Sequence, residues 1–164
     1  MTSGAQLDHW CRQNGVKAWA GTFCSDTLPP IYRPDDWCCI VNHSPCDSPS
    51  GGTHWLACRI QDTKAFWFDS FGFPPYSPLE NELMGHAENP YFLPWLKASG
   101  VSIPVTYNER DMQGVTGDEC GLYAAYFCKH GMPAMNRGAW SFLSASPSAN
   151  DKAIQSKVRI PLDK

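Results

Sequence analysis

The sequence predicts an α+β fold, in which helices flank a small mixed, partly antiparallel sheet and a cysteine begins a central helix. Three short apolar runs of strand length, at 37–42, 54–60 and 64–69, indicate the sheet. An apolar stripe with helical spacing follows Cys120 and indicates the central helix. The 164 residues contain no internal repeat and no linker, so we expect a single domain over 1–164.

The first expected element is a short amphipathic helix. Ser3, with Gln6 three residues later, resembles a capping box at its start, and Gly15 is expected to follow its end. The next stretch, 21–34, is rich in Pro and turn-forming residues and is predicted to be a loop. The buried stripe of the helix would consist of Leu7, Trp10 and Cys11.

The expected strands follow in close succession. The short apolar run at 37–42 predicts a buried strand, and the polar stretch at 43–52 is a loop by composition. The runs at 54–60 and 64–69 are separated by three turn-forming residues, so they form a predicted hairpin.

The stretch after the hairpin is expected to be mixed, with helices followed by a further strand. Residues 79–100 predict one or two helices, interrupted by Pro90 and Pro94. Residues 101–107 predict a strand that Pro104 confines to a sheet edge or a bulge.

The central helix begins near Cys120, and Gly131 with Pro133 is expected to end it. The remainder of the chain is predicted to be irregular. The apolar stripe of this helix contains Leu122, Tyr126 and Phe127.

The composition is that of a globular protein, with 43% apolar and 18% charged residues. No apolar run reaches the length of a membrane span, and the start MTSGAQLDHW has no signal-peptide pattern, so we expect an intracellular protein without membrane association. The net charge of −3 argues against general nucleic-acid binding. The segment from Asn150 on carries four basic and two acidic residues, and we interpret it as a solvated end.

Cysteine is abundant, with eight residues in the chain. Because no secretion signal precedes them and the chain is long enough for a full core, we expect free thiols rather than disulfides. The cysteines are Cys11, Cys24, Cys38, Cys39, Cys46, Cys58, Cys120 and Cys128.

The candidate nucleophile is Cys120, at the point where a loop becomes a helix. Free N–H groups and the helix dipole at such a start favour a thiolate, which is the nucleophilic form of cysteine. The N–H of Cys120 could also point at a developing oxyanion, and Gly121 would let a substrate backbone approach closely.

The candidate base is His54, which opens a strand directly after Gly51 and Gly52. Asp69 ends the partner strand of the hairpin, so antiparallel pairing makes these two side chains neighbours. The carboxylate would orient the imidazole, as nucleophile and base pairs require. Gln113 would add a side-chain N–H to the oxyanion site.

Three segments, "GGTHWLA", "FWFDSFGF" and "QGVTGDECGL", together resemble the His, acid and Gln…Cys-Gly segments of the adenovirus maturation protease (adenain) family. The wider clan of deSUMOylase-like cysteine proteases shares this order. "GTF" at Gly21 and "WCCIVN" are also similar to the adenovirus enzymes. The resemblance covers roughly Leu7 to Met132 and rests on several motifs in one order.

The resemblance implies a cysteine endopeptidase with a Cys-His-Asp mechanism. In it Cys120 would be the nucleophile, His54 the general base, Asp69 its orienting acid and Gln113 the oxyanion donor. The family cleaves viral precursor proteins after small residues, at sites with glycines near the scissile bond. This preference implies a narrow aromatic-walled tunnel. The resemblance also implies action in the virion and the host cell nucleus. The implied substrate-binding residues are Gly52, Trp55 and Gly121.

Two departures from the adenovirus enzymes concern the acid and the cofactors. The acid is Asp69, as in the deSUMOylase branch, whereas the adenovirus enzymes commonly carry Glu at this position. The cysteine that holds the family's activating peptide corresponds to Ser102, and the chain is acidic whereas the DNA-activated enzymes are basic. We therefore expect no required cofactor, and activation by a peptide or by DNA stays an open alternative.

Several alternatives remain beside this interpretation. The chain could be a deconjugating protease for ubiquitin-like modifiers or an inactive relative that only binds a partner, and Trp55 could belong to the sheet core. A zinc site is the rival chemistry, although its spacing matches no paired Cys-x-x-Cys pattern and adjacent cysteines in a strand face opposite sides. Its ligands would be Cys38, Cys39, His43 and Cys46.

Overall fold

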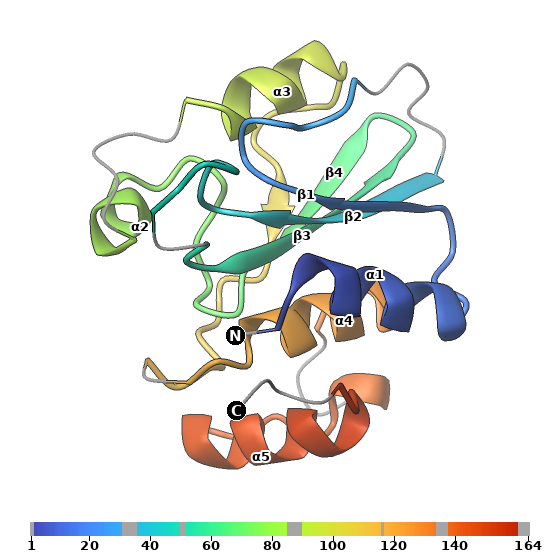
Figure 1. Ribbon diagram of the computed structural model, residues 1–164, viewed down its shortest axis with the longest axis vertical. Coiled ribbons are helices and arrows are strands. Elements are labelled where there is room, and N and C mark those ends of the chain that lie inside the picture. Colours follow the sequence, from blue (N-terminus) through green and yellow to red (C-terminus); the bar gives the residue numbers. More distant parts are fainter. Residues whose placement is uncertain are drawn as a thin grey trace.

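The computed structural model has the α+β fold that the sequence predicts. A mixed sheet of five strands forms the middle layer of the described residues, and helices lie on both of its faces (Figure 1). No helix in the described ranges combines the length and the apolar character that a membrane crossing requires. Gly51 lies outside the ranges described, which are 2–30, 36–49, 52–84, 90–115, 117–133 and 138–160.

The sheet has three antiparallel central strands and two edge strands that run parallel to their neighbours. In sheet order the strands are β1 (Trp19–Phe23), β2 (Asp36–Asn42), β3 (Trp55–Gln61), β4 (Lys64–Phe68) and β5 (Thr106–Tyr107). The predicted hairpin forms between β3 and β4, and its register pairs Gln61 with Lys64 and Ala57 with Phe68. His54 therefore directly precedes one hairpin strand, and Asp69 directly follows the other.

Helices cover the two faces of the sheet unequally. The helices are α1 (Gly4–Gln13), α2 (Pro78–Leu83), α3 (Phe92–Ala98), α4 (Cys120–His130) and α5 (Pro147–Lys157), with a short 3₁₀ turn at Gly138–Trp140. α1 and α4 lie against one face, and α5 lies beyond α4 as an outer layer (Figure 1). α3 lies on the opposite side of the sheet (Figure 1).

Two hydrophobic cores result from this arrangement. Alternate side chains of a strand point to opposite faces, so Cys38 packs in the core under α1 and α4, whereas Cys39 packs in the core under α3. Phe68 and Trp67 divide in the same way on β4.

The first and the central helix begin where the sequence predicts. The Ser3 hydroxyl accepts the Gln6 N–H at 3.2 Å, and Gln6 Oε1 accepts the Ser3 N–H at 2.8 Å, which completes the capping box. α4 begins at Cys120 and ends before Gly131, whose φ of +80° suits a glycine. The helices predicted within 79–100 form as α2 and α3.

Three elements differ from the sequence prediction. β1 occupies the first part of the loop predicted at 21–34, because a five-residue edge strand containing a glycine carries little strand signal. The strand predicted at 101–107 is reduced to β5. The end predicted to be irregular contains α5, whose start was signalled by Ser146, which accepts the Ala149 N–H, and by a proline in the first turn.

The expectation that all eight cysteines are free thiols is wrong for one pair. Cys24 and Cys46 form a disulfide between the loops that follow β1 and β2. Because these neighbouring strands are parallel, the loops that follow them leave the sheet at the same end, and the two cysteine side chains meet there. The six other cysteines are free and buried.

Candidate active site

Three segments meet at one end of the sheet to form the candidate site. His54 directly precedes β3, Asp69 directly follows β4, and Cys120 is the first residue of α4. The antiparallel hairpin brings the start of β3 beside the end of β4, as predicted. Packing of α4 against β3 then brings the helix start to the same place.

The imidazole of His54 is held by a buried carboxylate. His54 Nε2 lies 2.7 Å from Asp69 Oδ1, and the Phe71 N–H donates to the same oxygen at 2.8 Å. With Nε2–H donating to the carboxylate, Nδ1 is the ring nitrogen that can take up a proton. Burial disfavours the charged ring, but the charge of Asp69 and hydrogen bonds with Asp69 and Cys120 raise the pKa of His54 well above its usual value.

The sulfur of Cys120 lies at the start of α4 and accepts a backbone N–H. Glu119, the residue before the helix, makes no side-chain cap, so the N–H groups of the first turn can interact with an anion. The Trp55 N–H also points at Cys120 Sγ at 3.4 Å. Only 4% of Cys120 and 1% of His54 are exposed. Both residues are therefore almost completely covered by their neighbours.

Gln113 is fixed on the loop that leads to Cys120. The Ser70 hydroxyl donates to Gln113 Oε1, and Gln113 Nε2 donates to the Gly117 carbonyl at 2.9 Å. The Ser70 carbonyl in turn accepts the Gln113 N–H at 3.3 Å. These contacts fix which end of the amide is the donor and use one of its two N–H groups.

The C-terminal helix α5 fastens the same loop from outside. Asp151 accepts the Gly114 N–H at 3.1 Å and the Tyr123 hydroxyl at 2.8 Å. Asn150 Nδ2 donates to the Met112 carbonyl at 3.1 Å. The loop is thereby tied both to α4, through Tyr123, and to α5.

Trp55 belongs to the core and also lines a pocket. Its indole N–H donates to the Thr2 carbonyl at 2.8 Å, and the side chain packs with the residues under α1 and α4. A Cβ at Gly121 would lie 3.1 Å from Trp55 and 3.3 Å from Leu7. Gly121 therefore makes room for interior packing, whereas the sequence predicted an approach of substrate backbone.

Gly52 stands in a conformation that other residues rarely adopt. Its φ is +115°, and a Cβ there would lie 2.8 Å from the Asn42 side chain. Together with Trp55 it lines a pocket of about 400 Å³, which also includes Thr22 and Ser44. This pocket is where the structure brings two of the three predicted substrate-binding residues together.

A second pocket adjoins the site on an apolar surface. Phe71 stacks on His54 with ring centroids 4.7 Å apart and also lines a pocket of about 330 Å³. The other lining residues include Phe73, Leu83 and Val115, of which Leu83 and Val115 are strongly exposed. The pocket therefore suits an apolar side chain close to the reacting centre.

Sequence reasoning missed several residues that support the acid. The Asn108 amide accepts the Asp69 N–H at 2.9 Å and donates to the Asp69 carbonyl. Ser70 and Phe71, which hold Gln113 and Asp69, could have been suspected because they directly follow the acid. Glu80 of α2 lies buried beside Asp69, and no local motif signals it.

The three cysteines and one histidine considered for zinc do not converge. Cys38 and Cys39 lie in opposite cores, and Cys46 is bonded to Cys24. The described residues contain two close sets of possible ligands, one of which includes the disulfide-bonded Cys24 and Cys46 beside Asp26. The other set consists of His54, Asp69 and Glu80. Because His54 and Asp69 are already paired with each other, we assign no metal site there.

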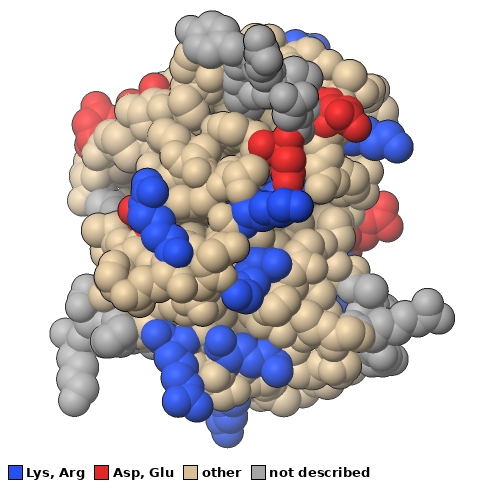
Figure 2. All heavy atoms as spheres, turned by 90° about the vertical axis from the view of Figure 1, so that its right-hand side faces the viewer, with Lys and Arg blue, Asp and Glu red and all other residues tan. Residues whose placement is uncertain are grey.

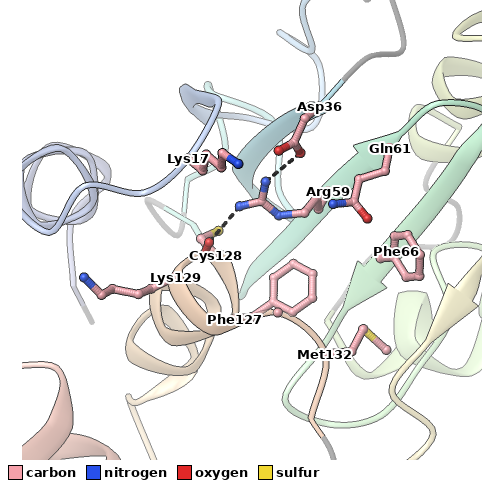
Figure 3. A pocket seen from close by; sticks show the side chains of 10 residues that line it. Lys17, Asp36, Arg59, Gln61, Phe66, Phe127, Cys128, Lys129 and Met132 are labelled. Carbon is pink, nitrogen blue, oxygen red and sulfur yellow. Dashed lines mark hydrogen bonds and ion pairs between the residues drawn. The ribbon is translucent and has the colours of Figure 1, made fainter. Parts of the chain in front are cut away.

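A further pocket of about 420 Å³ lies away from the candidate site, at the end of α4 (Figure 3). Arg59 bridges the sheet and the helix there, with Nη1 2.7 Å from Asp36 and Nη2 2.8 Å from the Cys128 carbonyl. Lys17 and Lys129 also line it. Lys and Arg side chains gather on one face of the molecule (Figure 2), so an acidic chain nevertheless has a locally basic surface.

Comparison with known proteins adds no family to this geometry. No protein-family model matches the chain. A search of curated proteins likewise finds no significant match.

Proposed function

We propose that this chain is a cysteine endopeptidase of the adenovirus-protease type, which cleaves precursor proteins at Gly-containing sites. The observation that carries the proposal is the position of His54, with one ring nitrogen 2.7 Å from Asp69 and with Cys120 close enough to raise the pKa of the ring. A buried imidazole between a carboxylate and a thiol at a helix start is the arrangement that an activated sulfur nucleophile requires.

The reaction would be an acyl transfer in two stages. The Cys120 thiolate attacks the scissile carbonyl, and the oxyanion accepts hydrogen bonds from the Cys120 N–H and from Gln113. His54, protonated at Nδ1, gives this proton to the leaving amine. The neutral ring then takes a proton from water, whose hydroxide attacks the thioester and releases the acid and the thiolate.

The preference for glycine is part of the proposal and comes from the family resemblance. Trp55 and Gly52 would line the passage on one side of the site, and the apolar pocket at Phe71 would take a larger side chain on the other. The substrates would be viral structural precursors, and the site of action the virion and the host nucleus. Activation by a peptide or by DNA remains part of the test because the sulfur and the ring are covered.

The test is digestion of fluorogenic peptides with and without glycines at the scissile bond. Wild-type protein should cleave the glycine peptides, and Cys120→Ala should not, while Cys58→Ala serves as the matched control because Cys58 is also a buried free cysteine. Retained cleavage by Cys120→Ala would defeat the assignment. Parallel assays with DNA and with candidate precursor peptides determine whether the covered site needs an activator.

A deconjugating protease is the second candidate, because the acid is an aspartate as in the deSUMOylase branch. Fusions of ubiquitin-like proteins that end in Gly-Gly separate the two functions. Cleavage of these fusions without cleavage of internal peptide sites would favour deconjugation. If neither substrate is cut and iodoacetamide labels Cys120 no faster than the other cysteines, the chain is an inactive binding relative.

A further inference from the structure

A second buried carboxyl group lies behind the acid of the candidate site. Glu80, on α2, is 2% exposed, and its backbone N–H donates to the Ser77 hydroxyl at 3.2 Å at the start of the helix. One ligand atom each from Glu80, Asp69 and His54 lie within 4.8 Å of one another. The site therefore contains two carboxyl groups and one imidazole in a single buried cluster.

Two oxygens of this cluster lack a donor. Asp69 Oδ2 and Glu80 Oε2 are both buried, and no described residue outside the pair donates a hydrogen bond to either oxygen. An unsatisfied buried carboxylate oxygen is costly, and two neighbouring carboxylates cannot both stay ionised in an apolar interior. One proton located between the two groups removes both problems at once.

The surroundings decide which group carries the proton. Burial raises the pKa of Glu80 to about 10, together with the hydrogen bond that protonated Glu80 donates to Asp69 and the negative charge of Asp69. Burial acts against ionisation of Asp69 too, but the charge of His54 and hydrogen bonds from Glu80, His54 and the Phe71 N–H lower the pKa of Asp69. The proton therefore belongs to Glu80, and the negative charge to Asp69.

The other charged groups near the pair do not reverse this distribution. His43 Nε2 lies 3.8 Å from Glu80 Oε1, too far for a hydrogen bond. Burial raises the pKa of Asp111, and the negative charge of Asp69 raises it further, so Asp111 lies near the pair. A further negative charge nearby increases the need for a neutral Glu80.

We infer that Glu80 is a positioning residue of the reaction, which as a neutral carboxylic acid donates a hydrogen bond to Asp69 and fixes that carboxylate toward His54. Its role in catalysis rests on the proposed protease function. The location of the proton rests on the buried cluster alone, and it can be measured in a protein that cleaves nothing.

The first experiment therefore does not use activity. In protein labelled with ¹³C at the glutamate carboxyl, wild type should show one resonance that stays protonated at pH 7 and titrates near pH 10. Glu80→Gln should remove this resonance, whereas Glu82→Gln, an exposed change on the same helix, should keep it. If every glutamate resonance of the folded protein titrates below pH 6, the inference is wrong.

The second experiment compares a variant that keeps the donor with one that loses it. Glu80→Gln retains an N–H for Asp69, so kcat/KM at pH 7 should stay within about threefold of wild type, and the alkaline fall in kcat/KM should move upward in pH. Glu80→Leu removes the donor and should lower kcat more than tenfold, with little change in KM. Equal losses in both variants, without a change in the pH profile, would mean a merely structural role.

Two controls keep these outcomes distinct. Titration of the ¹⁵N-labelled His54 ring should give the same pKa in Glu80→Gln as in wild type and a changed pKa in Glu80→Leu, if the latter folds. If wild type is inactive but the carboxyl resonance behaves as expected, the protease proposal fails and the proton location stands. If wild type is active and the resonance is absent, the protease proposal stands and the location of the proton on Glu80 is wrong.

Discussion

Replacing Asp69 by Asn isolates the contribution of the carboxylate charge. Asp69 Oδ1 accepts N–H groups from both His54 and Phe71, at 2.7 and 2.8 Å. An asparagine satisfies both donors only if its carbonyl oxygen occupies that position. The variant should therefore keep the ring orientation and the proton on Nε2, while the charge opposite the imidazolium is lost.

The magnitude follows from the burial of the pair. Asp69 is fully buried and His54 nearly so, and removal of one partner of a buried ion pair costs about 3–5 kcal/mol. At about 1.4 kcal/mol for each tenfold change, the rate of the step that needs the imidazolium should fall by roughly two to four orders of magnitude. The pKa of His54 should fall as well, because the charge of Asp69 is what outweighs burial.

The assay is kcat/KM on a Gly-containing fluorogenic peptide, combined with ¹⁵N titration of the His54 ring. Asp62→Asn is the matched control, since Asp62 is exposed in the turn of the same hairpin and its φ of +54° is one that asparagine tolerates. A folded Asp69→Asn protein with kcat/KM within threefold of wild type would refute the reasoning.

Three further predictions concern the oxyanion loop, pH and the disulfide. Gln113→Ala should lower kcat by about a hundredfold or more, with Gln155→Ala on α5 as the control; an unchanged kcat would remove Gln113 from the oxyanion site. Stability should fall as pH rises from 6 to 9, by at most about 1.4 kcal/mol per pH unit for each group, because the folded state retains protons on Glu80 and His54 that the unfolded chain releases. Urea unfolding measures this slope, and a slope that Glu80→Gln leaves unchanged would exclude Glu80 as a source. The double change Cys24→Ser and Cys46→Ser should lower the free energy of unfolding by about 3 kcal/mol, since the bond closes a loop with a sequence separation of 22; equal urea midpoints would contradict this.

The part of the site that lies on a local motif could be predicted from the sequence. Adjacent strands with a short turn fix the neighbours at their ends, so the hairpin alone indicated that His54 and Asp69 meet, and the structure confirms it. The helix start at Cys120 followed in the same way from a stripe and a stop signal. The catalytic roles of these residues stay predictions.

The parts that depend on distant packing could not be predicted. Glu80 joins the site because α2 folds back over the end of β4, and a glutamate on a short helix ordinarily indicates an exposed face. The disulfide depends on two loops brought together by parallel pairing of β1 with β2. α5 buries only Asn150 and Ile154 within its length, too few apolar positions to give a helical stripe.

The fastening of the Gln113 loop by Asn150 and Asp151 has a consequence for the order in which the protein matures during translation. The ribosome delivers α5 after every member of the proposed catalytic set. A nascent chain therefore contains Cys120, His54 and Asp69 before α5 can hold the Gln113 loop in place. Competence for cleavage would then arise only once α5 has docked on this loop.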